Sequence, residues 1–249
     1  MRKHILSILL GLATTTTLST PLPVQAEPQV YQLVSGKENL RLNEETFNVL
    51  ESLGLSLASL ENTVTPDPGF TVALPLLPPS DDPNVRGTTF TFSYDDETNT
   101  FIPLSGVEAF ASRVIFNVNT AQLALEPQLV IGELSTAFSP DFEFFLFTGT
   151  IGNGLRLFDV VSPRPPLVDL ENQIITPQST EVRISQEFSD LLMAAGATES
   201  VAGLKIADVT GDKRFVEIST TKVPEPGSAI AILMVIGATL AMGKQRRVE

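Results

Sequence analysis

The chain has 249 residues with no Cys, no Trp and a single His, and its formal net charge at pH 7 is −13. The histidine, His4, lies in an N-terminal segment that we expect to be removed. Catalytic triads, zinc sites and iron–sulfur sites need imidazole or thiolate groups, so these classes are excluded for the mature chain. Residues 27–222 hold 27 acidic and 11 basic side chains, a net charge of −16, which argues against nucleic-acid binding.

The first 26 residues have the three parts of an export signal. Arg2 and Lys3 form a positive start, residues 5–13 form an apolar run, and small residues at Val24 and Ala26 precede the expected cleavage after Ala26. The alternative is a retained transmembrane helix, which needs about twenty apolar residues. The sequence therefore predicts a signal peptide over residues 1–26 and signal peptidase as a partner.

Two segments, residues 42–54 and 184–196, have the pattern of short capped helices. Each has an N-cap candidate (Asn43 or Ser185), acidic residues in its first turn and a glycine at its end. The two segments align without a gap at an offset of 142 residues, and the preceding pairs, Leu40-Arg41 and Val182-Arg183, extend the match as short strands. An internal repeat and a coincidence of common capping patterns both account for this alignment.

Alternating apolar residues predict strands in the middle of the chain. Residues 89–94 place Phe90, Phe92 and Tyr94 on one face, residues 95–99 read as a turn, and a return strand starts at Phe101. Residues 113–118 alternate in the same way, and Leu123 with Leu125 continues the pattern after a polar turn. Both segments are typical of hairpins.

A third hairpin is predicted from residues 142–147, which hold four Phe and one Leu, and residues 155–161 beyond a glycine-rich turn. The first of these strands is expected to be buried on both faces. Prolines crowd residues 66–83 and 163–166, so neither segment is expected to form a helix or a central strand. We expect the first to be a long exposed loop next to a strand near residues 70–74, and the second to be a surface connector.

Together these patterns predict a mainly β domain over residues 27–222, either an antiparallel β-sandwich or another β-rich arrangement, with two short helices. Acidic residues cluster at Asp81–Asp82, at residues 95–97, and at Asp208 with Asp212. None of these clusters has the spacing of a calcium-binding loop, and loop aspartates commonly form turns. No catalytic residue, metal ligand or cofactor-binding residue is assigned.

The C-terminus carries the most specific motif. Val223, Pro224, Glu225 and Pro226 precede residues 227–243, which are uncharged, and Lys244, Arg246 and Arg247 lie in the final residues 244–249. A helix over residues 227–243 would be about 25 Å long, enough to cross a bilayer, with its basic end in the cytoplasm. The two prolines keep Glu225 in an extended segment just outside the membrane.

These three parts over residues 223–249 resemble a PEP-CTERM sorting domain of Gram-negative bacteria and cyanobacteria. The resemblance implies cleavage near the Pro-Glu-Pro triplet by an exosortase, a membrane transpeptidase-like enzyme, in cells that make extracellular polysaccharide. The protein would then be anchored in the inner membrane as a precursor and reach the cell surface or the medium after cleavage. The alternative is a permanent membrane anchor.

The body has a looser resemblance to secreted HtaA-like surface domains. It rests on the order of parts: the helix that begins near Asn43, a Pro-rich break, Arg86-Gly87-Thr88 opening an aromatic strand, and the segment Gly154-Leu155-Arg156-Leu157-Phe158-Asp159. Some members of that group bind haem through His or Tyr, and Tyr94 is the residue that the resemblance would make an axial ligand here.

Three functional classes remain open on these grounds. The first is a non-enzymatic structural or binding protein of the cell surface or matrix, associated with exopolysaccharide. The second is a surface protein that binds haem or another small hydrophobic ligand, and the third is a glycan hydrolase that uses only carboxylates. The absence of recognisable catalytic chemistry favours the first class.

Overall fold

The computed structural model describes residues 29–151 and 154–218. Within them the protein is mainly β, with antiparallel sheets and two short helices, which confirms the predicted β-rich architecture. The signal peptide, its cleavage site at Ala26 and the sorting segment from Val223 onward lie outside the described residues. No helix among the described residues is long and apolar enough to cross a membrane.

Half of the sixteen strands in the described residues form a closed ring in which each strand pairs with the next. Seven antiparallel ladders join its eight strands in the order β3, β1, β15, β14, β11, β10, β9 and β6. The ring closes between β6 and β3, because Leu77 N donates to Ala109 O and Ala111 N donates to Pro75 O. The bounds are β1 Gln29–Leu42, β3 Val72–Pro75, β6 Glu108–Ala109, β9 Ser135–Phe138, β10 Phe144–Phe147, β11 Arg156–Val161, β14 Thr180–Ile184 and β15 Lys205–Thr210.

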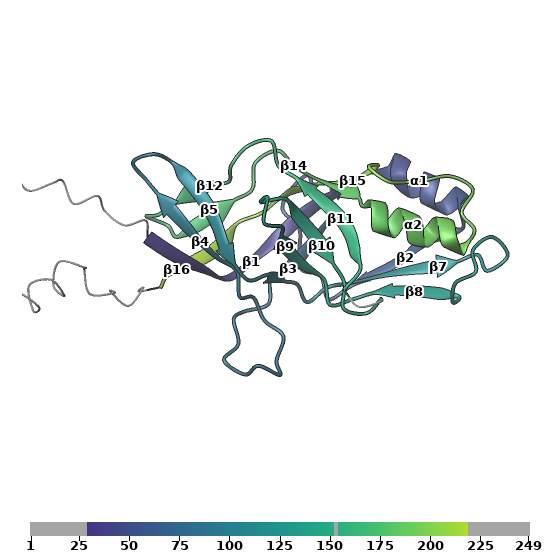
Figure 1. The fold of residues 1–249 in the computed structure, drawn as a ribbon, viewed down its shortest axis with the longest axis horizontal. Helices are drawn as coiled ribbons and strands as arrows, with labels where there is room; N and C mark the ends of the chain where they lie inside the picture. The colour runs from purple at the N-terminus through teal and green to yellow at the C-terminus, as the bar shows by residue number, and fades with distance from the viewer. Residues whose placement is uncertain (1–28, 152–153, 219–249) are drawn as a thin grey trace, which may run out of the picture.

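The long strand β1 extends beyond this ring and builds a second group of strands at one end of the molecule (Figure 1). Its first half pairs with β16 on one side and β4 on the other, and the remaining strands continue outward from these two. They are β4 Thr91–Asp95, β5 Thr100–Ser105, β12 Leu167–Asp169, β13 Ile174–Thr176 and β16 Lys213–Glu217. An aromatic cluster fills this end, with Tyr31 stacked on Phe92 and edge-on to Phe215.

Two helices and a small sheet lie at the other end of the ring (Figure 1). Helix α1 (Glu44–Ser52) follows β1 directly, and helix α2 (Gln186–Ala195) follows β14, each capped by the predicted side chain, Asn43 or Ser185. The small sheet consists of β2 (Leu55–Glu61), β7 (Arg113–Val118) and β8 (Gln128–Ile131). Phe47 of α1 stacks on Phe116 of β7, so the helix and the small sheet are packed together.

The predicted hairpins are confirmed in part. Strands β4 and β5 pair across the predicted turn, and Phe90, Phe92 and Tyr94 are all buried. The second hairpin has the predicted first strand, but its partner is β8, so the prediction of a return strand at Leu123 and Leu125 is wrong. Leu123 is instead buried within a turn, where its backbone N–H bonds to Asn119 O.

The third hairpin, β10 with β11, is also confirmed, but its first strand is not buried on both faces. Within β10 only Leu146 is buried, and Phe142 is 55% exposed with a positive φ outside the strand. The prediction that the proline-rich residues 66–83 form no central strand is also wrong at Pro75. This residue ends β3, which has a neighbour on each side in the ring, because proline's carbonyl still accepts a bond from Ala111 N. The exposed loop predicted after this strand is present (Figure 1).

Candidate functional site

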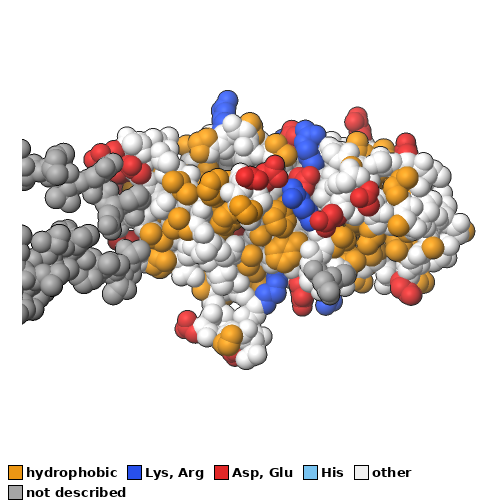
Figure 2. Space-filling model, in the orientation of Figure 1, with side chains coloured by type: hydrophobic (Ala, Val, Ile, Leu, Met, Phe, Trp, Pro, Cys, Tyr) orange, Lys and Arg blue, Asp and Glu red, His pale blue; other side chains and the backbone are white. Residues whose placement is uncertain are grey.

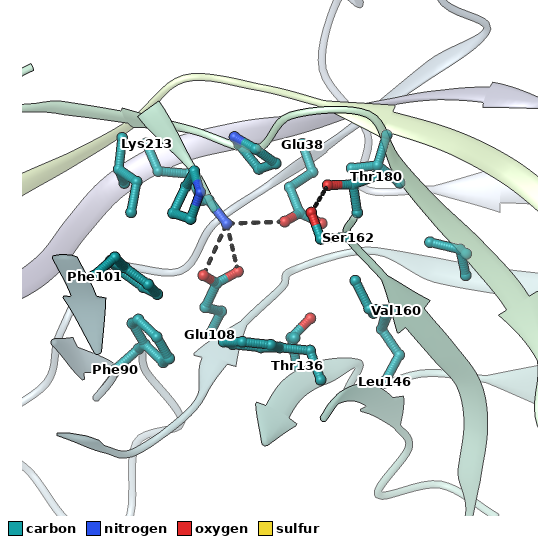
Figure 3. Close-up of a pocket in the computed structure, with 16 residues that line it drawn as sticks. Glu38, Phe90, Phe101, Glu108, Thr136, Leu146, Val160, Ser162, Thr180 and Lys213 are labelled. Carbon is teal, nitrogen blue, oxygen red and sulfur yellow. Dashed lines mark hydrogen bonds and ion pairs between the residues drawn. The ribbon is translucent and has the colours of Figure 1, made fainter. Parts of the chain in front are cut away.

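A buried cluster of one lysine and two glutamates lies inside the ring (Figure 3). Lys213 Nζ donates to Glu38 Oε1 at 3.0 Å and to both carboxylate oxygens of Glu108 at 2.8 Å. The three residues come from β16, β1 and β6, and their side chains are 6%, 11% and 6% exposed. Three distant parts of the chain therefore supply one ionic cluster, in which a single ammonium group bonds to both carboxylates.

The backbone of β1 positions two of these side chains. Gly36 pairs with Lys213, and a Cβ at Gly36 would lie 2.5 Å from Asp212 O and 2.7 Å from the Lys213 Cα. Its φ of +132° also favours glycine. This glycine allows β16 to approach β1 closely at Lys213, and the side chain of Glu38, two residues further along β1, accepts a bond from Lys213 Nζ.

The cluster forms one wall of a cavity of about 90 Å³. Apolar side chains from several strands make most of the remaining wall, including Phe90, Phe101, Leu146, Val160, Val182 and Val209. Three hydroxyl groups also line it, those of Thr136, Ser162 and Thr180 (Figure 3). Ser162 and Thr180 bond to each other at 2.7 Å, so these two hydroxyls are satisfied.

Thr136 differs from these two hydroxyl residues. Among buried side-chain oxygen and nitrogen atoms of residues 29–151 and 154–218, its Oγ1 is the one without a hydrogen-bond partner. Thr136 is 6% exposed and lies directly opposite Glu108 across the β6–β9 ladder. An unpaired buried hydroxyl costs about 1–3 kcal/mol. A polar group entering the cavity beside Glu108 would recover that cost.

The cavity adjoins an open groove at the surface. The groove has a volume of about 670 Å³ and shares Phe101, Phe144, Val160, Ser162 and Pro166 with the cavity wall. Its outer rim includes the proline segment of residues 163–166, which confirms the predicted surface connector. Figure 2 shows apolar side chains gathered on the face where β5, β10 and β11 lie. Elongated molecules could therefore reach the cavity through a largely apolar approach.

Burial and the neighbouring charges both shift the pKa values of Glu108 and Lys213. Burial raises the pKa of Glu108 to about 6, although Lys213 opposes this shift, and the negative charge of Glu38 adds to it. Burial alone would lower the pKa of Lys213, but the attraction of Glu108 and Glu38 outweighs burial and raises it. Among the described residues that line the cavity, only these three carry a charge. The wall therefore holds one uncompensated negative charge when both carboxyl groups are ionised.

This arrangement predicts a specific pH dependence of stability. A carboxyl group whose pKa rises on folding stabilises the fold below its unfolded pKa of 4.5, and this contribution is lost as the pH rises through about 6. We expect Glu108 to make the free energy of unfolding about 2 kcal/mol lower at neutral pH than near pH 4.5. Urea unfolding at both pH values should show this change in the wild type and not in Glu108→Gln. An equal pH dependence in the two proteins would contradict the assignment.

The residues singled out from the sequence lie elsewhere. Tyr94 is buried, donates its hydroxyl to Asn99 Oδ1 at 2.7 Å, and does not line the cavity or its groove. Asp95 accepts bonds from the backbone of its own turn, whereas Asp208 pairs with Arg41 and Lys205. Within the described ranges no three acidic or histidine side chains come together as a metal site. The sorting residues Pro224, Glu225, Pro226, Lys244, Arg246 and Arg247 lie outside those ranges.

Sequence reasoning missed Glu38, Glu108 and Lys213, although a signal for them exists. Each alternates with an apolar residue two positions further on, namely Leu40, Phe110 and Phe215. Residues two apart in a strand share a face, so each charge lies on a face that is otherwise apolar.

No family model, no curated protein and no solved structure matches this chain, and the two resemblances drawn from its sequence therefore stay predictions.

Proposed function

We propose that the protein is an exported, non-enzymatic surface protein whose β-rich body binds a small, mainly apolar molecule inside its ring of strands. Export is supported by the signal-peptide pattern that ends at Ala26. Sorting by an exosortase-like enzyme, and association with exopolysaccharide, are supported by the Pro-Glu-Pro tail. The ligand-binding part is supported by the described residues themselves.

The cavity is the observation that carries the binding proposal. Its wall is mostly apolar, yet it ends in a bonded ionic cluster and an unpartnered hydroxyl, Thr136 Oγ1. Ligand sites commonly combine an apolar wall with a few converging polar groups in this way. Filling such a cavity with side chains would stabilise the fold, so its presence beside converging polar groups favours a ligand site. Neither carboxylate of the cluster is free of Lys213, which gives the hydrolase alternative no support.

The size of the cavity sets the size of the ligand. A dry cavity of about 150 Å³ holds benzene, so the space of about 90 Å³ accepts only part of a six-carbon molecule. The rest of such a molecule would lie against Phe101, Phe144 and Pro166, where the cavity meets the groove. Haem is too large for this cavity. The ligand we propose is smaller and elongated.

A cavity-filling variant tests this function. Thermal unfolding of the full chain is followed with 1-hexanol, n-hexylamine or hexanoate present, and we expect at least one of them to raise the unfolding midpoint. Val160→Phe places a ring in the cavity and should raise the Kd of that ligand at least about tenfold, a loss of about 1.4 kcal/mol.

Val216→Phe is the matched control, because Val216 lies on strand β16 and is 39% exposed. This variant should bind as the wild type does. If none of the three molecules shifts the midpoint, or if both variants lose binding equally, the body does not bind a ligand in this cavity.

A further inference from the structure

The charge of the cavity wall points to one class of ligand. Two carboxylates face one ammonium group, and no other charged side chain lines the cavity among the described residues. A buried charge without a counter-charge is costly, and proteins pair such charges or neutralise them. Near neutral pH, Glu108 keeps its negative charge, because its pKa of about 6 lies below that range. A cationic ligand would supply the missing counter-charge.

The hydrogen-bonding groups of the cavity wall also favour a cationic ligand. Both oxygens of Glu108 accept from Lys213, but two carboxylate oxygens together offer about four lone-pair sites, so each can accept a further bond. Thr136 Oγ1, across the ladder from Glu108, also has lone pairs to offer and no partner. A ligand group that only accepts hydrogen bonds could bond to the Thr136 hydroxyl but not to the ionised Glu108 carboxylate. A group with several donors could bond to Glu108 and Thr136 together.

Based on the ligand-binding function proposed above, we propose that this cavity takes a primary alkylamine, with its ammonium group bonded to Glu108 and Thr136 and its alkyl chain directed toward the groove. An ammonium group has three donors, which match the carboxylate and the hydroxyl. Its alkyl chain would meet Val160, Phe101 and Phe144, which line both the cavity and the groove. The amine would therefore compensate the excess negative charge, bond to the unpaired hydroxyl and place its alkyl chain against apolar side chains.

Two other ligand classes fit these features less well. Carboxylates such as hexanoate would bring a second negative charge next to Glu108 and would leave the excess charge in place. Neutral alcohols would bond to Thr136 Oγ1 and gain the same apolar contacts, but they would not compensate the charge. The order of affinity expected at neutral pH is amine, then alcohol, then carboxylate.

Titration calorimetry of the full chain at about pH 7.5 tests the proposal with n-hexylamine, 1-hexanol and hexanoate. We expect n-hexylamine to bind at least about tenfold more tightly than 1-hexanol, since a charged partner adds about 1.4 kcal/mol or more. Glu108→Gln keeps the shape and the bond from Lys213 but removes the excess charge, and it should bring the two affinities within about twofold of each other. Thr136→Val, which is nearly isosteric, should weaken n-hexylamine binding several-fold without unfolding the protein.

The outcomes separate this proposal from the function on which it depends. If 1-hexanol or hexanoate binds as tightly as n-hexylamine, the cavity is a ligand site but the amine assignment is wrong. If Glu108→Gln keeps the full preference for the amine, the charge argument is wrong. If none of the three binds, the binding function and the amine assignment both fail.

Discussion

Replacing Lys213 with Met should lower the free energy of unfolding by about 3–5 kcal/mol at neutral pH, the usual cost of removing one partner from a buried ion pair. Met fills a similar volume, so little packing is lost. What changes is the charge, because Glu38 and Glu108 would face each other inside the ring without the ammonium group that now bonds both. Urea unfolding at about pH 7.5 measures the effect.

A triple variant provides the control for this experiment. Combining Lys213→Met with Glu38→Gln and Glu108→Gln removes all three charges, and it should recover a large part of the lost stability, because amide groups can bond to each other without a counter-ion. Lowering the pH toward 5 should also reduce the loss in the single variant, since its carboxyl groups then take up protons. A loss below about 1 kcal/mol in Lys213→Met would mean that the cluster is not the buried ion pair described above.

The second large effect concerns the C-terminal tail. If the sorting proposal holds, changing Pro224 and Pro226 to Ala should leave the tail uncut and the protein in the inner membrane, because alanine would let the proposed membrane helix extend through Glu225. Intact-mass measurement of the envelope protein would then show a chain that ends at Glu249. The wild type should begin at Glu27 and lack residues after the triplet.

The double variant Pro78→Ala and Pro79→Ala is the matched control, because both prolines are exposed in the loop after β3. It should be processed as the wild type is. Normal cleavage of the Pro224 and Pro226 variant would show that the tail does not need its extended triplet, and the sorting proposal would then fail.

The helices and most hairpins could be predicted because their signals are local. Asn43 and Ser185 each accept a bond from a backbone N–H three residues later, and this geometry follows from residue type and spacing. The β4–β5 hairpin follows from alternation on each side of a polar turn. Both aligned segments have the expected strand–helix form, since β1 runs into α1 and β14 runs into α2, and this form is compatible with an internal repeat and with a coincidence of capping patterns.

The closure of the ring could not be predicted from these local signals. It depends on β3 meeting β6, and the bonds involved, from Leu77 N to Ala109 O and from Ala111 N to Pro75 O, join residues more than thirty positions apart. The prolines of residues 66–83 argued against a central strand at Pro75. Pairing with β1 and β6 nevertheless places this residue in one. The partner of β7 was missed for a similar reason, because Leu123 looks like a strand residue but is buried within a turn.

The candidate site was less predictable than the fold. Its charged residues are separated in sequence by up to 175 positions, and only the ring brings them together. Their alternation with apolar neighbours could have suggested buried charges, but it does not say which charges meet. Thr136 carries no sequence signal, because its lack of a partner is a property of the packed structure.

A crystal structure of the protein grown with n-hexylamine near neutral pH tests the central claim most directly. The account predicts the amine nitrogen within about 3 Å of a Glu108 carboxylate oxygen and of Thr136 Oγ1, and the alkyl chain against Val160 and Phe101. An amine bound only at the outer surface, or an alkyl end pointing at Lys213 with the nitrogen in solvent, would contradict it.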